Sequence, residues 1–412
     1  MTAASGGPDP ATLPASGPAA VLATATAAQV AVSVVNFGLP SIGPELAEDF
    51  DLGLTMLGAV LTAGLLGSGL TLVAAGVAVD RYGARAVTLA GTVLGTASLG
   101  LAAFARDPAL LIPLLFLFGV GTSAVPIAGI GAIFRAYPAS RRAWALGVRQ
   151  MAVPLGGITA AVALPPLAHA GGTRTALLFC AGVLAVLGGV FGIAGGDARP
   201  PGAERPRAEV RRILALPGMW RLLACAALLI LVLQSVLVFA VPASEAAGLS
   251  RFAAGAVFFA IQIAAGVARI AWGRRADTGG GARRVRTLVE ASWTAAAGGL
   301  LFALALHAGP AAVVPAVILF AFGALGWNAL VYVQAGEMAP PQLAAQSVSI
   351  VATLVFVLSA ALTPPMGALA EHAGWDAFWL AAGGLAACAA LVAGTLRPAP
   401  RERPASGASS GL

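Results

Sequence analysis

About twelve long apolar segments constrain the fold of this chain more than any other feature of its sequence. Each reaches the roughly 20 residues that an α-helix needs to cross the hydrocarbon core of a bilayer. Charged residues make up only 10% of the 412 residues, too few to cover the surface of a water-soluble fold of this size. The predicted spans are residues 19–40, 53–78, 85–105, 109–134, 143–166, 174–195, 219–242, 252–273, 286–306, 311–335, 343–368 and 375–396.

The residues within these segments favour helices over the strands of a membrane β-barrel. Barrel strands alternate polar and apolar side chains, and these segments do not. The chain contains 52 glycines and abundant alanine, which allow membrane helices to pack closely. We therefore predict an all-α integral membrane protein.

Arginine placement predicts the orientation of the chain in the membrane. No lysine is present, and with a cytoplasmic N-terminus the outer loops hold only Arg106, Arg174 and Arg251. The positive-inside rule then places both termini in the cytoplasm of a multi-pass protein of the inner (plasma) membrane. The net charge of +7 reports this topology, so no nucleic-acid partner is expected. The arginines expected inside are Arg81, Arg85, Arg135, Arg141, Arg142, Arg199, Arg205, Arg207, Arg211, Arg212, Arg221, Arg274, Arg275, Arg283, Arg284, Arg286, Arg397, Arg401 and Arg403.

A short charged turn occurs twice between apolar segments. Gly76-x-x-x-Asp80-Arg81-x-Gly83-x-Arg85 joins the second and third spans, and Gly273-Arg274-Arg275-Ala276-Asp277 follows about half a chain later. Such a repeat predicts two similar halves. The predicted units are a disordered cytoplasmic tail 1–18, a six-helix bundle 19–195, a cytoplasmic linker 196–217, a second six-helix bundle 218–396 and a cytoplasmic tail 397–412.

The first turn resembles the signature loop of the major facilitator superfamily. The number of spans, the central linker and the second turn are also similar to those of the family. The resemblance implies a monomeric transporter with twelve transmembrane helices in two pseudo-symmetric bundles that rock about a mid-membrane site. It also implies that Asp80 and Arg85 help to latch the halves in the outward-facing state; the alternative is a turn that only sets topology. The second turn departs from the pattern at Thr278 and is loosened by glycines, which favours the first as the gate. The gating candidates are Gly76, Asp80, Arg81, Gly83, Arg85, Gly273 and Asp277.

The fifth span contains a sequence that predicts a bend. Pro154 frees a backbone carbonyl, and Gly156 and Gly157 allow close packing. The surrounding residues partly resemble the Gly-Pro motif of drug/proton antiporters of the same superfamily, but Val153 replaces the glycine before the proline. The bend follows from the residues, and antiport does not.

Two arginines fall inside predicted spans, where an unpaired charge costs about 3 kcal/mol. Arg149 lies well inside the fifth span, and we expect it to attract a negative or carbonyl-rich substrate; the alternative is an arginine snorkelling to the inner surface. Arg269 lies near the inner end of the eighth span. It is as consistent with a structural pair to Glu290 as with a substrate contact.

Uncharged polar residues on several spans complete the candidate substrate path. Any one of them is as consistent with an interhelical hydrogen bond as with a substrate contact. The spacing of Gln262, Gly266, Arg269 and Gly273 predicts that one face of the eighth span points inward. The uncharged candidates are Asn36, Thr122, Ser123, Gln150, Gln234, Gln262, Trp327, Asn328 and Tyr332.

These features favour a secondary transporter of a small anionic or polar metabolite, with efflux of an amphiphilic drug as the alternative. An integral-membrane lipid-modifying enzyme would need paired acidic residues or a histidine cluster, which the sequence lacks. No enzyme activity, cofactor or metal is therefore expected. A non-transporting sensor would carry a sizeable signalling domain.

No acidic residue lies at mid-span, so proton coupling is only implied by the resemblance. Facilitated diffusion and the direction of transport stay open.

Overall fold

A computed structural model describes residues 17–52, 54–195 and 209–397, and within them every regular element is helical. Most of the predicted tail 1–18, residues 196–208 of the predicted linker and the predicted tail after Arg397 lie outside the described residues. The second part of the linker forms a short helix, α9 (Val210–Leu214). The backbone N–H of Glu209, next to α9, donates to Gln346 Oε1 at 3.1 Å.

The first half of the chain supplies six membrane crossings. Two crossings are broken near their middle, between α5 and α6 and between α7 and α8. Helix α8 reverses direction at Gly171 and Gly172, where Gly172 has a φ of 70° that glycine adopts readily, so α8 contributes to two crossings. The elements are α1 (Pro18–Ser41), α2 (Gly43–Asp49), α3 (Leu54–Tyr82), α4 (Ala84–Ala102), α5 (Pro108–Thr122), α6 (Ala124–Ala136), α7 (Arg142–Gln150), α8 (Ala152–Val190) and a π-helical turn, Phe191–Gly195.

The second half repeats this plan. Helix α16 reverses at Gly374, whose φ is 78°, and so forms the last two crossings. A π-helical turn, Ser235–Phe239, interrupts the crossing made by α10 and α11. The elements are α10 (Met219–Gln234), α11 (Ala240–Ala246), α12 (Arg251–Asp277), α13 (Gly280–Ala308), α14 (Pro310–Ala324), α15 (Asn328–Met338), a 3-10 turn, Pro341–Leu343, and α16 (Ala344–Gly394).

The number of crossings agrees with the prediction from the sequence. Over the described residues, 11 helical stretches are long and apolar enough to span a membrane. One of them, Arg142–Ala194, has 53 residues and contains the reversal in α8, so it accounts for two crossings. The predicted all-α fold of twelve membrane helices is confirmed.

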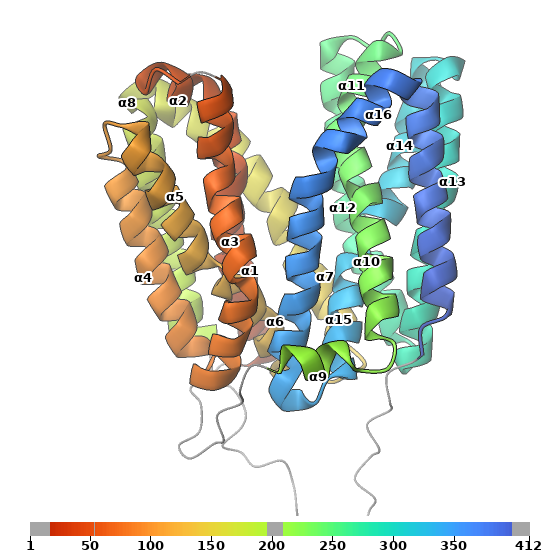
Figure 1. The fold of residues 1–412 in the computed structure, drawn as a ribbon, viewed down its shortest axis with the longest axis horizontal. Helices are drawn as coiled ribbons and strands as arrows, with labels where there is room; N and C mark the ends of the chain where they lie inside the picture. The colour runs from red at the N-terminus through yellow and green to blue at the C-terminus, as the bar shows by residue number, and fades with distance from the viewer. Residues whose placement is uncertain (1–16, 53, 196–208, 398–412) are drawn as a thin grey trace, which may run out of the picture.

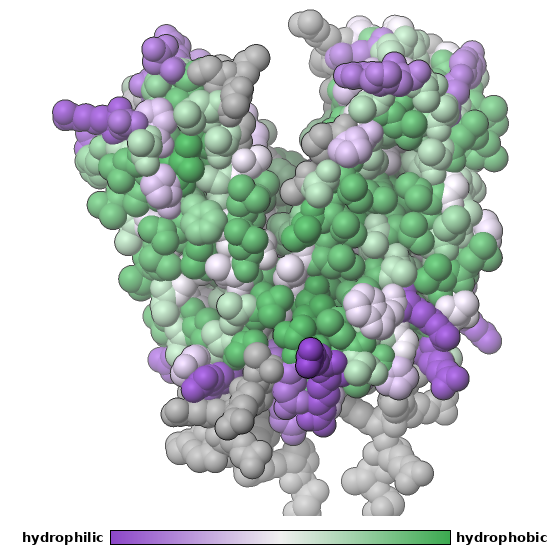
Figure 2. All heavy atoms as spheres, viewed as in Figure 1, coloured by the Kyte–Doolittle hydropathy of each residue, from purple (hydrophilic) through white to green (hydrophobic). Residues whose placement is uncertain are grey.

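The two halves meet at one end of the molecule and separate at the other (Figure 1). We call the end that carries α9 and the α3–α4 turn the closed end, and the end that carries α2 and α11 the open end. Figure 2 shows a hollow between the halves at the open end and an apolar belt between polar residues at both ends. Exposed side chains in this belt include Leu70, Val162 and Leu391. Such a continuous apolar surface suits contact with lipid.

Glycines set the close packing of helices within each half. A Cβ atom at Gly119 of α5 would overlap the carbonyl oxygen of Gly64 in α3 and lie 2.8 Å from the backbone nitrogen of Ser68. The Ser68 hydroxyl donates to the Gly119 carbonyl at 3.0 Å across the same contact. Since lipid offers no hydrophobic drive for helices to associate, close backbone contact is a main source of stability in such a bundle.

Gly119→Leu should therefore destabilise the first half by about 1–3 kcal/mol, the usual cost of overpacking. Thermal unfolding of the purified protein in detergent measures the effect. Gly182→Leu is the matched control, because a Cβ atom at Gly182 meets nothing within 4 Å. Equal melting temperatures for the two variants would contradict this account of the packing.

Candidate functional site

Two glycines bring α7 of the first half against α12 of the second half at the closed end. A Cβ atom at Gly147 would overlap the carbonyl oxygen of Arg269, and one at Gly273 would lie 2.6 Å from the carbonyl oxygen of Ala143. A Cβ atom at Gly266 would lie 2.8 Å from the Met151 side chain. The face of α12 that the sequence predicted to point inward thus carries two glycines that meet the other half.

Helices α3 and α16 make the equivalent contact on the other side of the closed end. A Cβ atom at Gly76 would lie 2.5 Å from Ser349 Oγ and 3.1 Å from the Ala345 carbonyl oxygen. Gly76 and Gly273 occupy matching places in the two repeated turns. Each removes the side chain that would hold the two halves apart.

The aspartates of the two turns each accept hydrogen bonds from a helix start in the opposite half. Asp80 Oδ2 accepts from the backbone N–H of Gln346 in the first turn of α16, at 3.1 Å. Asp277 accepts from the N–H groups of Ala143 and Trp144 in the first turn of α7, at 3.1 and 2.8 Å. A carboxylate at a helix N-terminus satisfies unpaired amides and the helix dipole together. The second turn, which the sequence favoured less, makes two such bonds.

One arginine of the first turn, Arg85, does not make the latch contact that the resemblance implied. Arg85 is exposed and forms no hydrogen bond or ion pair with any residue that the structure describes. Arg81 lies over the ring of Tyr82, with its Cζ atom 5.3 Å from the ring centroid. Gly83 has a φ of 88°, which allows the tight turn between α3 and α4. In this conformation Asp80 makes the bond to the other half, and Arg85 does not.

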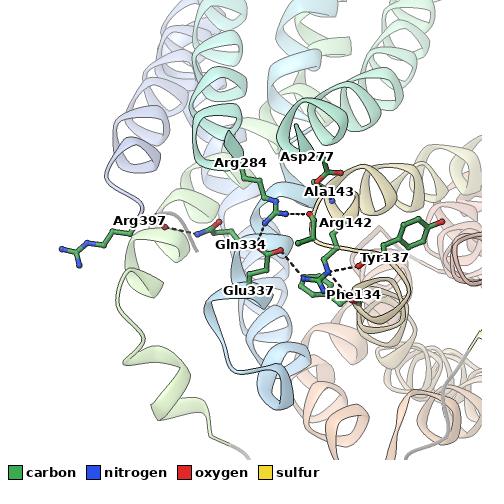
Figure 3. Close-up of polar contacts among 10 residues, drawn as sticks. Phe134, Tyr137, Arg142, Ala143, Asp277, Arg284, Gln334, Glu337 and Arg397 are labelled. Carbon is green, nitrogen blue, oxygen red and sulfur yellow. Dashed lines mark hydrogen bonds and ion pairs between the residues drawn. The ribbon is translucent and has the colours of Figure 1, made fainter. Parts of the chain in front are cut away.

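A group of charged residues ties the halves together beside the Asp277 bonds (Figure 3). Glu337 of α15 pairs with Arg284 of α13 and lies 3.6 Å from Arg142 of α7. Arg284 also donates to the carbonyl of Ala139 in the first half. The sequence predicts only a role in membrane topology for these arginines. The clue to this group in the sequence was Glu337, because an acidic residue at the end of a membrane span needs a partner.

Arg142 also fixes the loop that leads into α7. Its Nε donates to the carbonyl oxygens of Phe134 and Tyr137 at 3.2 and 3.1 Å. Its guanidinium lies over the Phe134 ring, 5.2 Å from the centroid. One side chain therefore connects the end of α6, the start of α7 and Glu337 of the other half.

Arg149 is buried near the C-terminal end of α7, the end away from the closed end, with 1% of its surface exposed. Its Nη2 donates to Gln29 Oε1 at 2.8 Å, and its Nε has no partner among the described residues. A Cβ atom at Gly129 would lie 2.6 Å from Nε, so this glycine makes room for the guanidinium. Such burial of Arg149 is incompatible with snorkelling to the surface. Tyr332 of the second half is buried as well.

Arg269 is 5% exposed and forms no hydrogen bond or ion pair with the described residues. The predicted alternative of a pair with Glu290 is wrong, because Arg275 binds that carboxylate, with Nη2 2.9 Å from Oε1. Six residues on a helix turn the side chain by about 120° relative to the starting direction, so Arg269 and Arg275 face different neighbours. Arg269 is left as a buried cation without a counter-ion among those residues.

The crossings made by α5–α6 and by α14–α15 are both interrupted, next to Gly121 in the first half and next to Gly326 in the second. At the second break, Trp272 Nε1 donates to the freed Phe322 carbonyl at 2.9 Å. Trp327 is fully buried, and neither its Nε1 nor Asn328 Oδ1 has a partner among the described residues. Unpaired polar atoms of this kind are costly to bury and are candidates for ligand contact.

The remaining predicted path residues differ in their surroundings. Thr122 and Ser123 donate to the Phe118 and Val120 carbonyls of their own crossing, at 2.9 and 2.7 Å. Three side chains are half-buried and form no hydrogen bond with the described residues: Asn36, Gln150 and Gln262. Gln234 is half-buried as well and has an interaction partner.

The predicted bend in the fifth crossing falls between α7 and α8. Pro154 lies in the first turn of α8 and has no N–H to donate, which suits a break close to Gln150. Gly156 packs against α1, where a Cβ atom would lie 3.0 Å from the Val30 carbonyl oxygen. Gly157 faces Phe37 more loosely, at 3.8 Å.

Comparison with known proteins places this geometry in a family. Residues 25–364 match the Major Facilitator Superfamily. An uncharacterized MFS-type transporter of Mycobacterium tuberculosis is 29% identical over 323 residues, covering 76% of this chain and 70% of that protein.

Solved structures of low sequence identity share the fold. The human organic anion transporter MFSD10 superposes with a TM-score of 0.74 at 16% identity, covering 91% of this chain and 99% of that one. The E. coli fucose:proton symporter FucP gives 0.74 at 14% identity, covering 91% and 97%. A bacterial homologue of the iron transporter ferroportin, in an outward-facing state, gives 0.70 at 13% identity, covering 91% and 98%.

Gly147→Ala should open the closed end, because the added methyl group overlaps the Arg269 carbonyl. A cysteine at Ala345, buried between α3 and α16 and placed in a background without the native cysteines, reports opening through maleimide labelling. Labelling should become several-fold faster than in the parent protein. Gly182→Ala serves as the control, and equal labelling rates in the two variants would refute the role of Gly147.

Glu337→Gln should destabilise the protein by more than a surface change, because it leaves Arg284 and Arg142 without their carboxylate. Removing one partner of a fully buried pair costs about 3–5 kcal/mol; Glu337 is 13% exposed, which favours the lower end. Glu209→Gln breaks an exposed pair with Arg212 and should cost about 0–1 kcal/mol. Thermal unfolding compares the variants, and similar losses would show that the Glu337 group adds no stability.

Proposed function

Because the chain belongs to the major facilitator superfamily, we propose that it carries a small organic anion across the membrane by alternating access. It is a multi-pass membrane transporter, and its family and relatives are transporters rather than enzymes. In alternating access, two bundles rock about a central site so that only one end is open at a time. The closed end, with its two aspartate-capped contacts, and the hollow at the open end fit one state of such a cycle.

The distribution of arginine supports a cytoplasmic location for the closed end. Three arginine-containing segments lie there, as the positive-inside rule requires of a cytoplasmic face: the turns Arg81–Arg85 and Arg274–Arg275 and the loop at Arg141 and Arg142. The described conformation is then outward-facing. The hollow seen in Figure 2 would receive substrate from outside the cell.

One observation carries the proposal of an anionic substrate: Arg149 and Arg269 are both buried and neither has a carboxylate partner among the described residues. Arg149 is seven residues from the start of α7, and Arg269 is eight residues before Asp277. Both therefore lie about 10–12 Å from the closed end, at similar depth. An uncompensated charge in a membrane is costly, and a bound anion would supply the missing counter-charge.

The alternative is an exporter of amphiphilic drugs, which the bend between α7 and α8 and its partial likeness to the antiporter motif favour. The solved structures named above are at most 16% identical to this chain and therefore show the fold alone. The choice between the two proposals therefore depends on the charge that the site prefers. Hydrophobic cations would gain nothing from two buried guanidinium groups.

A ligand screen by thermal shift should find small carboxylates that stabilise the purified protein, whereas the neutral amides of the same acids do not. Arg269→Gln should weaken binding at least about tenfold, since a charge-assisted hydrogen bond is worth about 1.5–3 kcal/mol. Arg106→Gln, at an exposed arginine of the open end, is the matched control. Uptake of the best carboxylate into proteoliposomes should follow the same order.

Stabilisation by hydrophobic cations that survives in Arg149→Gln and Arg269→Gln would instead support the drug exporter. Normal carboxylate uptake by both variants at normal expression would overturn the role given to the two arginines. Repeating the uptake with and without a pH gradient tests coupling, because identical rates would exclude proton-driven transport.

A further inference from the structure

A groove of about 600 Å³ opens at the closed end, where α7 of the first half meets α12 of the second. Both halves line it, so it exists in this form only while the two helices are in contact. The first half supplies Ser140, Arg141 and Trp144, and the second supplies Arg274, Asp277 and Thr278.

The groove is rich in donors that the protein does not use. The exposed side chains of Arg141, Arg274 and Ser140 form no hydrogen bond or ion pair with the described residues. Trp144 Nε1 also has no partner among them, but it is shielded from solvent and so is not accessible to a ligand in the groove. Of the three accessible donor side chains, two come from the first half and one from the second.

The acidic residue of the groove does not neutralise this charge by direct pairing. Both carboxylate oxygens of Asp277 accept backbone N–H groups of α7, at 3.1 and 2.8 Å. The Thr278 hydroxyl is likewise occupied, because it donates to the Arg275 carbonyl at 2.8 Å. Two guanidinium groups against one carboxylate leave the lining with a net positive charge.

We propose that this groove binds the phosphodiester headgroup of an anionic phospholipid from the leaflet at the closed end. Two arginines suit a phosphate, with the Ser140 hydroxyl as a further donor. A tryptophan and arginines at the ends of membrane helices lie at headgroup depth, where anionic lipids concentrate. A free phosphate ion shares the chemistry, but the position at the end of the apolar belt commits the proposal to lipid.

The headgroup acts on the conformational equilibrium. It contacts Ser140 and Arg141 in one half and Arg274 in the other, and this arrangement is lost when α7 and α12 separate. A ligand that binds one state better shifts the population toward that state. Anionic lipid therefore favours the conformation with the closed end shut, independently of the substrate.

The test measures thermal stability in nanodiscs of phosphatidylcholine alone and with increasing phosphatidylglycerol. The parent protein should gain stability with phosphatidylglycerol, and the Arg141→Gln/Arg274→Gln double variant should need at least about tenfold more for the same gain. Both arginines are exposed, so the substitutions leave the fold intact. Ser140→Ala removes only the hydroxyl donor and should give a smaller loss.

Arg286→Gln is the matched control, because Arg286 is exposed at the same end and lies outside the groove. It should respond to phosphatidylglycerol as the parent does. An equal response in the double variant would overturn the proposal. So would full stabilisation by inorganic phosphate in phosphatidylcholine nanodiscs, which would make the ligand a free ion.

Discussion

The contact of two helix pairs through glycine, α7 with α12 and α3 with α16, is the constraint on which the rest of this structure depends. At Gly76, Gly147 and Gly273 the backbone of one half reaches the other half closely enough for Asp80 and Asp277 to cap helices across the interface. A larger side chain at any of these positions would separate the helix starts from the aspartates. At the closed end, the aspartate caps therefore depend on the close glycine packing. The halves are in contact there and separate at the opposite end.

Much of this could be predicted from the sequence, because membrane spans and loop charges obey simple physical rules. Twelve crossings follow from apolar length, and two halves follow from the repeated turn. The partners of individual charges do not follow, because they depend on how helices rotate about their axes. Glu290 binds Arg275 instead of Arg269, and Glu337 binds Arg284 and Arg142, whose roles in the interface a count of loop charges could not identify.

The structure was also needed to show which of the two turns makes more hydrogen bonds to the opposite half. The loosened second turn suggested a degraded copy, yet Asp277 accepts two backbone N–H groups and Asp80 accepts one from Gln346. Glycines after the aspartate do not weaken a cap, since the bonded oxygens belong to α12 and the donors to α7. The buried, uncompensated Arg269 and the groove at Arg141 and Arg274 both border this α7–α12 contact. Substrate and lipid would thus act on the same pair of helices from different depths.

The most direct test of this account measures the distance between spin labels at Ala86 of α4 and Ala282 of α13, both exposed at the closed end. Double electron–electron resonance in the parent protein should give mainly a short distance. Replacing both caps, in Asp80→Ala/Asp277→Ala, should shift the distribution to longer distances, because the first turns of α16 and α7 then lose the carboxylates of the opposite half that cap them. An unchanged distribution in the double variant would contradict the claim that the aspartate caps keep the closed end shut.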